Sequence, residues 1–237
     1  MFKKIIALAI SAGLLFAASA HADEADVKKA VESVLGKNAR VDSVRKAGVL
    51  GLYEVVVGGE IVYVDEKAGY LIFGNIVDVK AKKDLTEERK LKLAQIKFSD
   101  LPLDLAIKQI KGNGKRIVAT FEDPNCGYCK KLAKELVGMT DVTIYTFLYP
   151  ILSPDSLEKS KNIWCASDKA KSWNDWMVNG SAPAAAKCDA SAVDKTVAFG
   201  QKLNIRGTPT IFFTDGSRAP GYMPVAQLEK AIAAAGN

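Results

Sequence analysis

Apolar residues recur at helical spacing at the start of the chain, within residues 24–35. The positions that share this face are Val27, Ala30, Val31 and Val34. Gly36 follows and is expected to end the helix. Apolar, strand-like runs come next over residues 52–57 and 61–64, and the Gly-Gly-Glu between them favours a hairpin. A further run over residues 70–73 completes the pattern, which predicts a small α+β unit over residues 23–80.

Charged residues dominate the chain over residues 80–97, with Leu85, Leu91 and Leu93 among them. Asp84 or Thr86 could cap a helix in this stretch. We interpret residues 81–100 as a solvated linker helix that joins two domains.

The pattern changes again after residue 100. Buried-strand runs cover residues 116–121, 142–148 and 210–213, and a turn at Asp215-Gly216 leads into residues 217–223. An amphipathic helix is expected from Cys129 onward, a largely helical block over 154–203, and a last helix after Pro224. This order predicts an α/β domain over residues 101–237 whose sheet has mixed strand directions.

The first 22 residues have the pattern of a signal peptide. Lys3 and Lys4 precede the apolar run 5–18, and Ala20-His21-Ala22 predicts cleavage before Asp23, with cleavage after Ala20 as the alternative. A membrane anchor is the competing interpretation, but the run is shorter than the roughly 20 residues that span a bilayer.

Cleavage would leave 215 of the 237 residues and lower the formal charge from +6 to +4, because Lys3 and Lys4 are removed. It would also remove His21, the only histidine, so we expect no imidazole ligand in the mature chain. The mild charge and the lack of an arginine-rich stripe with interleaved aromatics argue against a nucleic-acid partner.

Four cysteines remain, at 126, 129, 165 and 188, and an even number in an exported chain indicates disulfide chemistry. Cys126-Gly127-Tyr128-Cys129 lies between a predicted strand and a predicted helix, the setting of a redox dithiol. At the helix N-terminus the thiol pKa of Cys126 should fall below about 8.5, which makes Cys126 the candidate nucleophile. Cys129, one turn further and better shielded, is the candidate resolving thiol, and Gly127 allows close approach of a substrate backbone.

Two acidic residues, Glu122 and Asp123, precede the motif. One of them is a candidate to accept or supply the proton on Cys129. The competing interpretation is a solvated carboxylate in the turn before the helix, and the sequence does not choose between the two.

Two other roles for the close pair are disfavoured. Zinc normally needs four ligands. Cys165 and Cys188 lie 23 residues apart and form no second close pair, and the mature chain is expected to lack histidine, so we expect no metal site. A structural 126–129 disulfide would close too small a ring to stabilise much. A bridge between Cys165 and Cys188 would close a loop worth roughly 3 kcal/mol; the alternative is a second redox couple that passes electrons to the first.

Two segments resemble the thioredoxin superfamily. Residues 121–132 are similar to its strand–CxxC–helix element, and residues 206–211, Arg-Gly-Thr-Pro-Thr-Ile, to its second signature. The resemblance implies that Pro209 is cis, faces the dithiol and keeps metals from it, and that Thr208 pairs with a substrate strand; an ordinary trans proline is the alternative. Thr120 stands where many thioredoxins carry a buried acid, so an acid-assisted step is not carried over.

Within the superfamily the whole mature chain resembles the DsbC/DsbG family of periplasmic disulfide isomerases, and Cys-Gly-Tyr-Cys is the DsbC form of the motif. The resemblance implies a cystatin-like α+β dimerisation domain over residues 23–80, a linker helix over 81–100 and a thioredoxin-like catalytic domain over 101–237 with a helical insertion. It also implies that Cys165 and Cys188 form a structural disulfide. The candidate substrate contacts are Gly127, Tyr128, Thr208 and Pro209.

The same resemblance implies the biology. We expect a periplasmic, V-shaped homodimer that isomerises or reduces wrong disulfides in misfolded exported proteins, with chaperone activity and without a cofactor. Its expected partner is a membrane thiol reductant of the DsbD type. Two alternatives stay open: a thiol oxidase of the same fold, and a holdase chaperone whose redox site is incidental.

Overall fold

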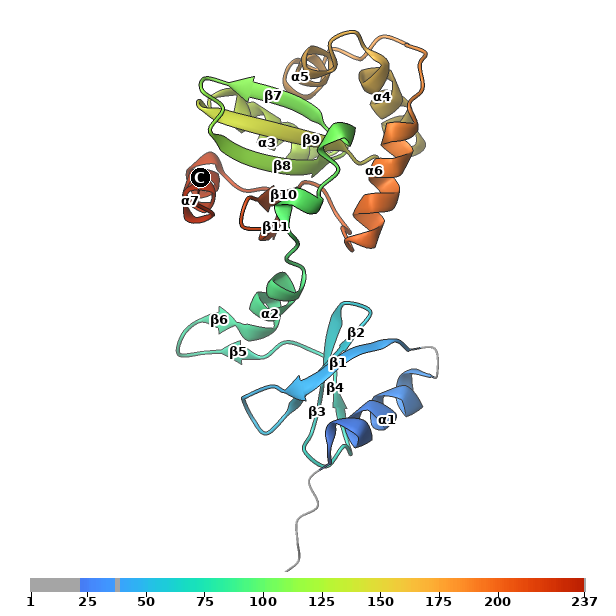
Figure 1. The fold of residues 1–237 in the computed structure, drawn as a ribbon, viewed down its shortest axis with the longest axis vertical. Coiled ribbons are helices and arrows are strands. Elements are labelled where there is room, and N and C mark those ends of the chain that lie inside the picture. Colours follow the sequence, from blue (N-terminus) through green and yellow to red (C-terminus); the bar gives the residue numbers. More distant parts are fainter. Residues whose placement is uncertain (1–21, 37–38, 237) are drawn as a thin grey trace, which may run out of the picture. The chain divides into compact units, whose positions relative to one another are not determined.

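The computed structural model describes residues 22–36 and 39–236. By their internal contacts the residues fall into two compact units, divided between Gly74 and Asn75 (Figure 1). The predicted signal peptide lies outside the described residues, apart from Ala22. Among the described residues, no helix has the length and apolar character needed to cross a membrane.

The first unit is one helix packed on a four-stranded antiparallel sheet of order β1-β2-β3-β4. The Asp23 carboxylate caps the helix, because the backbone N–H groups of Ala25 and Asp26 both donate to it at 2.9 Å. The elements are α1 (Glu24–Leu35), β1 (Val41–Lys46), β2 (Tyr53–Val57), β3 (Glu60–Val64) and β4 (Leu71–Ile72). The core of this unit consists of Val27, Val31, Tyr53, Val55, Val62 and Val64.

The structure confirms the predicted helix and hairpin of this unit. The apolar run 70–73 contributes only the two-residue strand β4. Strand β1 was not predicted, because its residues are exposed or half-buried and show no alternation of apolar side chains.

The charged stretch forms a two-stranded ribbon and then a helix, both of which belong to the second unit. They are β5 (Val77–Asp78), β6 (Lys83–Asp84) and α2 (Leu85–Leu93). Asp84 caps α2 by accepting from the Glu87 N–H at 2.9 Å. Thr86, the other candidate cap, instead accepts from the Ile76 N–H at 2.8 Å.

The second unit is built on a five-stranded sheet of order β11-β10-β8-β9-β7. Only β8 and β9 run parallel and every other neighbouring pair is antiparallel, which confirms the predicted mixed sheet. The strands are β7 (Ile107–Lys111), β8 (Arg116–Glu122), β9 (Val142–Leu148), β10 (Thr210–Phe213) and β11 (Arg218–Pro220). Edge strand β7 was not predicted, since only Ile107 and Ile110 are apolar in it.

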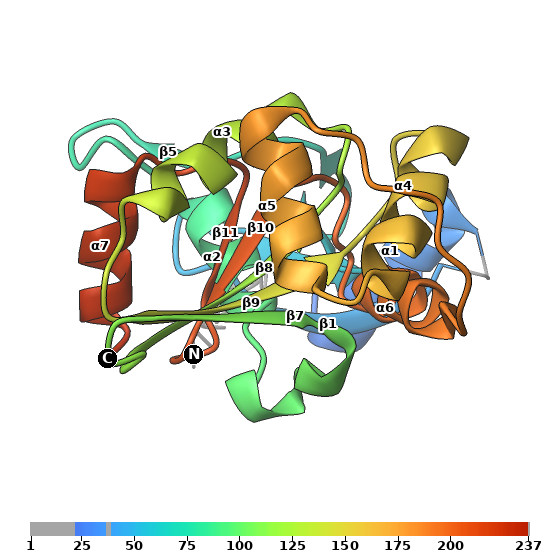
Figure 2. The same cartoon turned by 90° about the horizontal axis from the view of Figure 1, so that it is seen from above.

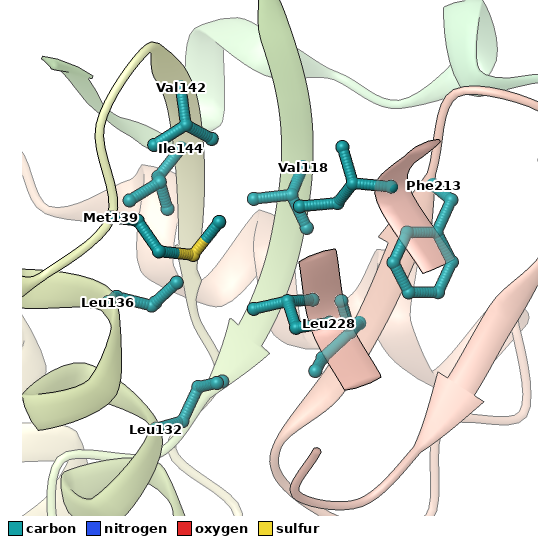
Figure 3. Packing of buried hydrophobic residues seen from close by; sticks show 10 residues of the cluster. Val118, Leu132, Leu136, Met139, Val142, Ile144, Phe213 and Leu228 are labelled. Atoms are coloured by element: carbon teal, nitrogen blue, oxygen red, sulfur yellow. The ribbon is translucent and has the colours of Figure 1, made fainter. Parts of the chain in front are cut away.

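Helices cover the sheet, and α3, α5 and α7 lie on the same face of it (Figure 2). On this face Val118, Ile144 and Phe213 of the strands pack against Leu132 of α3 and Leu228 of α7 (Figure 3). The helices around this sheet are α3 (Gly127–Val137), α4 (Pro154–Cys165), α5 (Lys169–Asn179), α6 (Ser191–Lys202) and α7 (Val225–Ala234). The helical block predicted over residues 154–203 corresponds to three of them, α4, α5 and α6.

Aromatic residues build the core on the other face of the sheet. Phe121 and Phe147 stack with ring centroids 4.5 Å apart, and Tyr149 meets the Phe121 ring edge-on. Side chains alternate along β8, so Phe121 points to this core while Thr120 and Glu122 point to the α3 face. Strand β8 therefore delivers Glu122 beneath the helix that carries the cysteines.

Candidate active site

Cys126 is the N-cap residue of α3, directly after the turn that follows central strand β8. Its Sγ accepts a hydrogen bond from the backbone N–H of Cys129 at 3.3 Å. The N-terminal N–H groups of a helix have no partner within the helix and favour a negative charge. The Cys126 side chain thus occupies the position expected from the sequence, and Cys126 is 6% exposed.

The pKa of Cys126 is lowered from 9.0 to about 6. The main cause is a hydrogen bond from the Cys129 thiol to the Cys126 thiolate, and the Thr208 side chain and the N–H groups of Cys129 and Tyr128 add to it, while burial opposes it. At pH 7 Cys126 is therefore mostly thiolate, the form that attacks disulfides.

Cys129 behaves in the opposite way. Its side chain is fully buried on the inner face of α3. Burial raises its pKa far above the ordinary value, and the nearby charges of Cys126 and Glu122 raise it further. Cys129 stays a thiol at neutral pH, so it needs a proton acceptor before it can act as a nucleophile.

The second signature lies directly against Cys126. Cys126 Sγ lies 3.3 Å from the backbone carbonyl oxygen of Thr208, to which the protonated thiol donates, and the Thr208-Pro209 peptide bond is cis. The four candidate substrate contacts differ in accessibility. A side chain at Gly127 would meet nothing within 4 Å and Tyr128 is 65% exposed, whereas Thr208 is half-buried and Pro209 is buried.

Neither acidic residue before the motif is a solvated turn carboxylate, so that interpretation is wrong: both side chains are fully buried. Asp123 has a structural role. Its carboxylate accepts from the backbone N–H groups of Asn125 at 2.8 Å, Ile151 at 2.8 Å and Leu152 at 2.9 Å. These bonds fix the turn before Cys126 to the loop that follows β9.

Replacing Asp123 by alanine should lower the free energy of unfolding by roughly 3 kcal/mol, because it leaves three amide donors without their acceptor. Urea denaturation of the purified variant measures this loss. The matched control is Asp155→Ala, which removes an exposed carboxylate that accepts from Asn125 Nδ2 at 2.6 Å and should cost about 1 kcal/mol or less. Equal losses in the two variants would contradict the structural role of Asp123.

Glu122 has a different environment. Its Oε1 accepts from the Thr120 hydroxyl at 2.7 Å, and its Oε2 has no hydrogen-bond partner among the described residues. Burial raises the pKa of Glu122 to about 8; the Thr120 bond lowers it and the charge of Cys126 raises it. Of the two carboxyl groups that the sequence offered for proton transfer, only Glu122 has an oxygen free to exchange one.

Helix α5 also supports the turn, through a residue that no sequence motif indicates. The Trp176 indole N–H donates to the backbone carbonyl of Pro124 at 2.6 Å. Pro124 precedes the Cys126–Cys129 motif in the sequence and Lys130 follows it. The Lys130 Nζ lies 4.0 Å from the centre of the same Trp176 ring. No local pattern could indicate this contact, which joins residues 52 positions apart.

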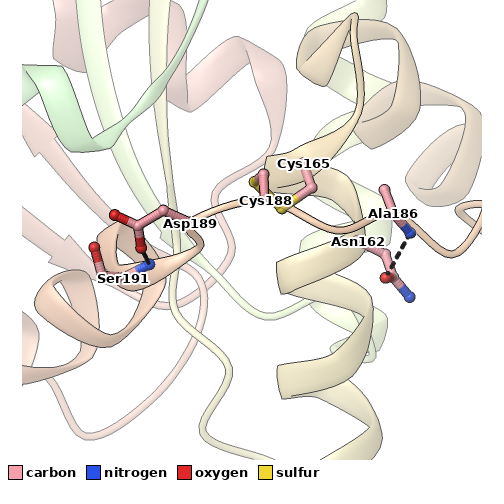
Figure 4. The surroundings of a disulfide bond; sticks show 6 residues. All are labelled: Asn162, Cys165, Ala186, Cys188, Asp189 and Ser191. Carbon is pink, nitrogen blue, oxygen red and sulfur yellow. Dashed lines mark hydrogen bonds between the residues drawn. A yellow bond between two sulfur atoms is a disulfide. The ribbon is translucent and has the colours of Figure 1, made fainter.

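Cys165 and Cys188 form a disulfide with a Cα–Cα distance of 5.5 Å (Figure 4). It joins the end of α4 to the segment before α6, where the Ala186 N–H also donates to Asn162 Oδ1 at 3.2 Å. Cys126 and Cys129 are the free cysteines of the described chain. In this structure the two pairs are therefore separate.

Comparison with known proteins matches both units to family models. The thioredoxin-like domain model matches residues 103–236, and the model of the disulfide bond isomerase protein N-terminal domain matches residues 18–87. The solved disulfide interchange protein from Neisseria gonorrhoeae superposes with a TM-score of 0.55 and 44% identity, over 56% of this chain and 97% of that one.

Curated relatives agree with these matches. The probable thiol:disulfide interchange protein DsbC of Bordetella pertussis is 53% identical over 179 residues, which is 76% of this chain but only 64% of the Bordetella protein. Thiol:disulfide interchange protein DsbC of Escherichia coli K12 is 28% identical over 220 residues, 91% of this chain and 89% of that protein. The expected combination of an N-terminal α+β domain and a thioredoxin-like domain is thereby confirmed, and the chain belongs to the DsbC family of thioredoxin-fold proteins.

Proposed function

We propose that this protein is an exported thiol:disulfide interchange enzyme that isomerises or reduces incorrect disulfides in other exported proteins. The observation that carries the proposal is the contrast between two thiols one helical turn apart. Cys126 has a pKa of about 6 at the helix N-terminus, whereas burial holds Cys129 in the thiol form.

The reaction begins when the Cys126 thiolate attacks one sulfur of a substrate disulfide. A bond forms between Cys126 Sγ and that sulfur, the substrate S–S bond breaks, and the second substrate sulfur leaves as a thiolate. That thiolate can attack another disulfide of the same substrate, and a later attack on the mixed disulfide returns Cys126 as a thiolate. The net result is isomerisation without gain or loss of electrons, so no cofactor is needed.

Release by Cys129 is the alternative end of the cycle. Cys129 Sγ attacks Cys126 Sγ, the S–S bond between Cys126 and the substrate breaks, the substrate sulfur leaves as a thiolate, and a Cys126–Cys129 disulfide forms. We assign to Glu122 the role of taking the proton from Cys129, because it is a buried carboxyl with an unpartnered oxygen on the α3 face. When Cys126 is in the mixed disulfide its negative charge is gone, and this removes one of the causes that hold Glu122 protonated.

The surroundings of Cys126 supply the proposed substrate contacts. Gly127 leaves room for a substrate backbone, Tyr128 offers an exposed ring, and Thr208 with Pro209 forms the wall against which an extended chain would pair. Cys165 and Cys188 brace the helical insertion in this proposal and do not exchange electrons with the dithiol.

The low pKa of Cys126 also indicates that the enzyme needs a reducing partner. It stabilises the reduced form relative to the disulfide, which makes the couple more oxidising. An isomerase with such a couple needs an external reductant, so we propose a membrane thiol donor of the DsbD type, in the periplasm. The match to the N-terminal domain of disulfide bond isomerases supports a homodimer joined through the first unit. We also propose chaperone activity toward misfolded chains.

The redox state of the dithiol in the cell tests this function. Acid quenching followed by thiol alkylation should find Cys126 and Cys129 mostly reduced, as an isomerase or reductase requires. A mostly oxidised pair would instead support the oxidase of the same fold. The holdase alternative predicts that Cys126→Ala still suppresses the aggregation of substrates that lack disulfides.

A further inference from the structure

A second tyrosine lies beside the motif, from a distant part of the chain. The rings of Tyr128 and Tyr222 are stacked, with centroids 6.2 Å apart and an interplanar angle of 29°. Tyr128 is in the first turn of α3, two residues after the nucleophile, and is 65% exposed. Tyr222 is half-buried in the loop between β11 and α7.

The loop that carries Tyr222 is fixed to the two sides of the site. The Gly221 N–H donates to the Pro209 carbonyl at 2.7 Å, so Tyr222 directly follows a residue bound to the cis-proline segment. On the other side the Tyr222 hydroxyl donates to Glu135 Oε1 of α3. The second oxygen of Glu135 accepts from the Val225 N–H at 2.7 Å.

These bonds decide what Tyr222 can offer to a ligand. Its hydroxyl is engaged by Glu135, which leaves the apolar ring for contact. The Lys131 Nζ lies 4.4 Å from the centre of the Tyr222 ring and interacts with the Glu135 carboxylate. A large apolar or aromatic side chain suits a surface of two tyrosine rings.

We infer that Tyr128 and Tyr222 together form an aromatic surface that binds a large apolar or aromatic side chain next to the disulfide-bonded cysteine of an unfolded substrate. The occupant is an extended protein segment, since the surface is continuous with Cys126 and with the Thr208-Pro209 wall. Tyr222 determines specificity here and Glu135 is a positioning residue. The inference rests on the proposed function, because it requires Cys126 to attack protein disulfides.

Two peptides test it, each carrying one cysteine as a mixed disulfide with glutathione and differing only in the neighbouring residue, phenylalanine or glycine. The measured quantity is the second-order rate constant of the reduced full-length protein with each peptide. We expect the phenylalanine peptide to react about three- to tenfold faster with the wild type, the range that one aromatic contact supplies. Tyr222→Ala and, separately, Tyr128→Ala should bring this ratio close to one.

The ratio is taken within each variant, so a change in overall reactivity does not affect it. Tyr145→Ala is the matched control: it removes another half-buried tyrosine with a lysine Nζ over its ring, at 5.6 Å, and should keep the wild-type ratio. A wild-type ratio near one, or an unchanged ratio in either Tyr128→Ala or Tyr222→Ala, would overturn the inference. If the wild type reacted with neither peptide nor with glutathione disulfide, the proposed function itself would fail.

Discussion

Cys126→Ala is expected to abolish disulfide exchange, with a loss of at least about a thousandfold in the rate of refolding of a substrate with scrambled disulfides. The physical reason is that no other thiol of the described chain is both free and ionised at neutral pH. Cys129 is the other free cysteine, and burial keeps it protonated. Recovery of substrate activity after dilution from denaturant measures the rate.

The matched control is Cys129→Ala, which keeps the nucleophile and removes the resolving thiol. This variant should still attack the substrate and should accumulate a mixed disulfide that is visible on non-reducing gels. Because the Cys129 thiol is the main cause of the low pKa of Cys126, the pH midpoint for alkylation of Cys126 should rise from about 6 in this variant. Scrambled-substrate refolding that persists in Cys126→Ala would exclude Cys126 as the nucleophile.

Glu122→Gln is expected to slow the Cys129-dependent release of the mixed disulfide by about 100-fold, the lower end of the range for a positioned proton acceptor. Glutamine keeps the size of the side chain and the oxygen that accepts from Thr120, and removes only the ability to take a proton. Single-turnover release of a fluorescent peptide from a preformed mixed disulfide measures this step. A rate within twofold of the wild type at every pH would rule out this role.

The pH dependence provides a matched control. A carboxyl with a raised pKa is protonated below that pKa, so release by the wild type should increase with pH and then level off. The midpoint should lie below about 8, because the Cys126 charge that helps to raise the pKa of Glu122 is absent from the mixed disulfide. Thr120→Val removes the hydrogen bond that lowers the pKa of Glu122, and should therefore move this midpoint to higher pH. Glu122→Gln should lack the increase that has this midpoint.

Stability gives an independent check of the same group. Because the folded state holds Glu122 protonated up to about pH 8 while an exposed glutamate ionises near 4.5, the wild type should lose stability relative to Glu122→Gln as pH rises between these values. Glu122→Gln has no such group. It should be as stable as the wild type near pH 4, and the more stable protein at pH 8, by about 2 kcal/mol or more.

The sequence by itself determined the features that depend on neighbours along the chain. The spacing of Val27 and Val31 specifies a helix with one buried face, and Gly58-Gly59 specifies a hairpin, because these patterns act within one or two turns of the backbone. The setting of Cys126 and Cys129 between strand β8 and helix α3 was predictable for the same reason, and it indicated which thiol would ionise.

Only the tertiary structure decided which groups meet across the fold. Asp123 is a structural acceptor because Ile151 and Leu152, 28 and 29 residues later, present their N–H groups to it, and Glu122 keeps a free oxygen because none are presented there. Tyr222 reaches Glu135 from 87 residues away, through a loop that β10 and β11 hold beside the site. Such contacts arise when distant segments close on a common core, and no local periodicity encodes that closure.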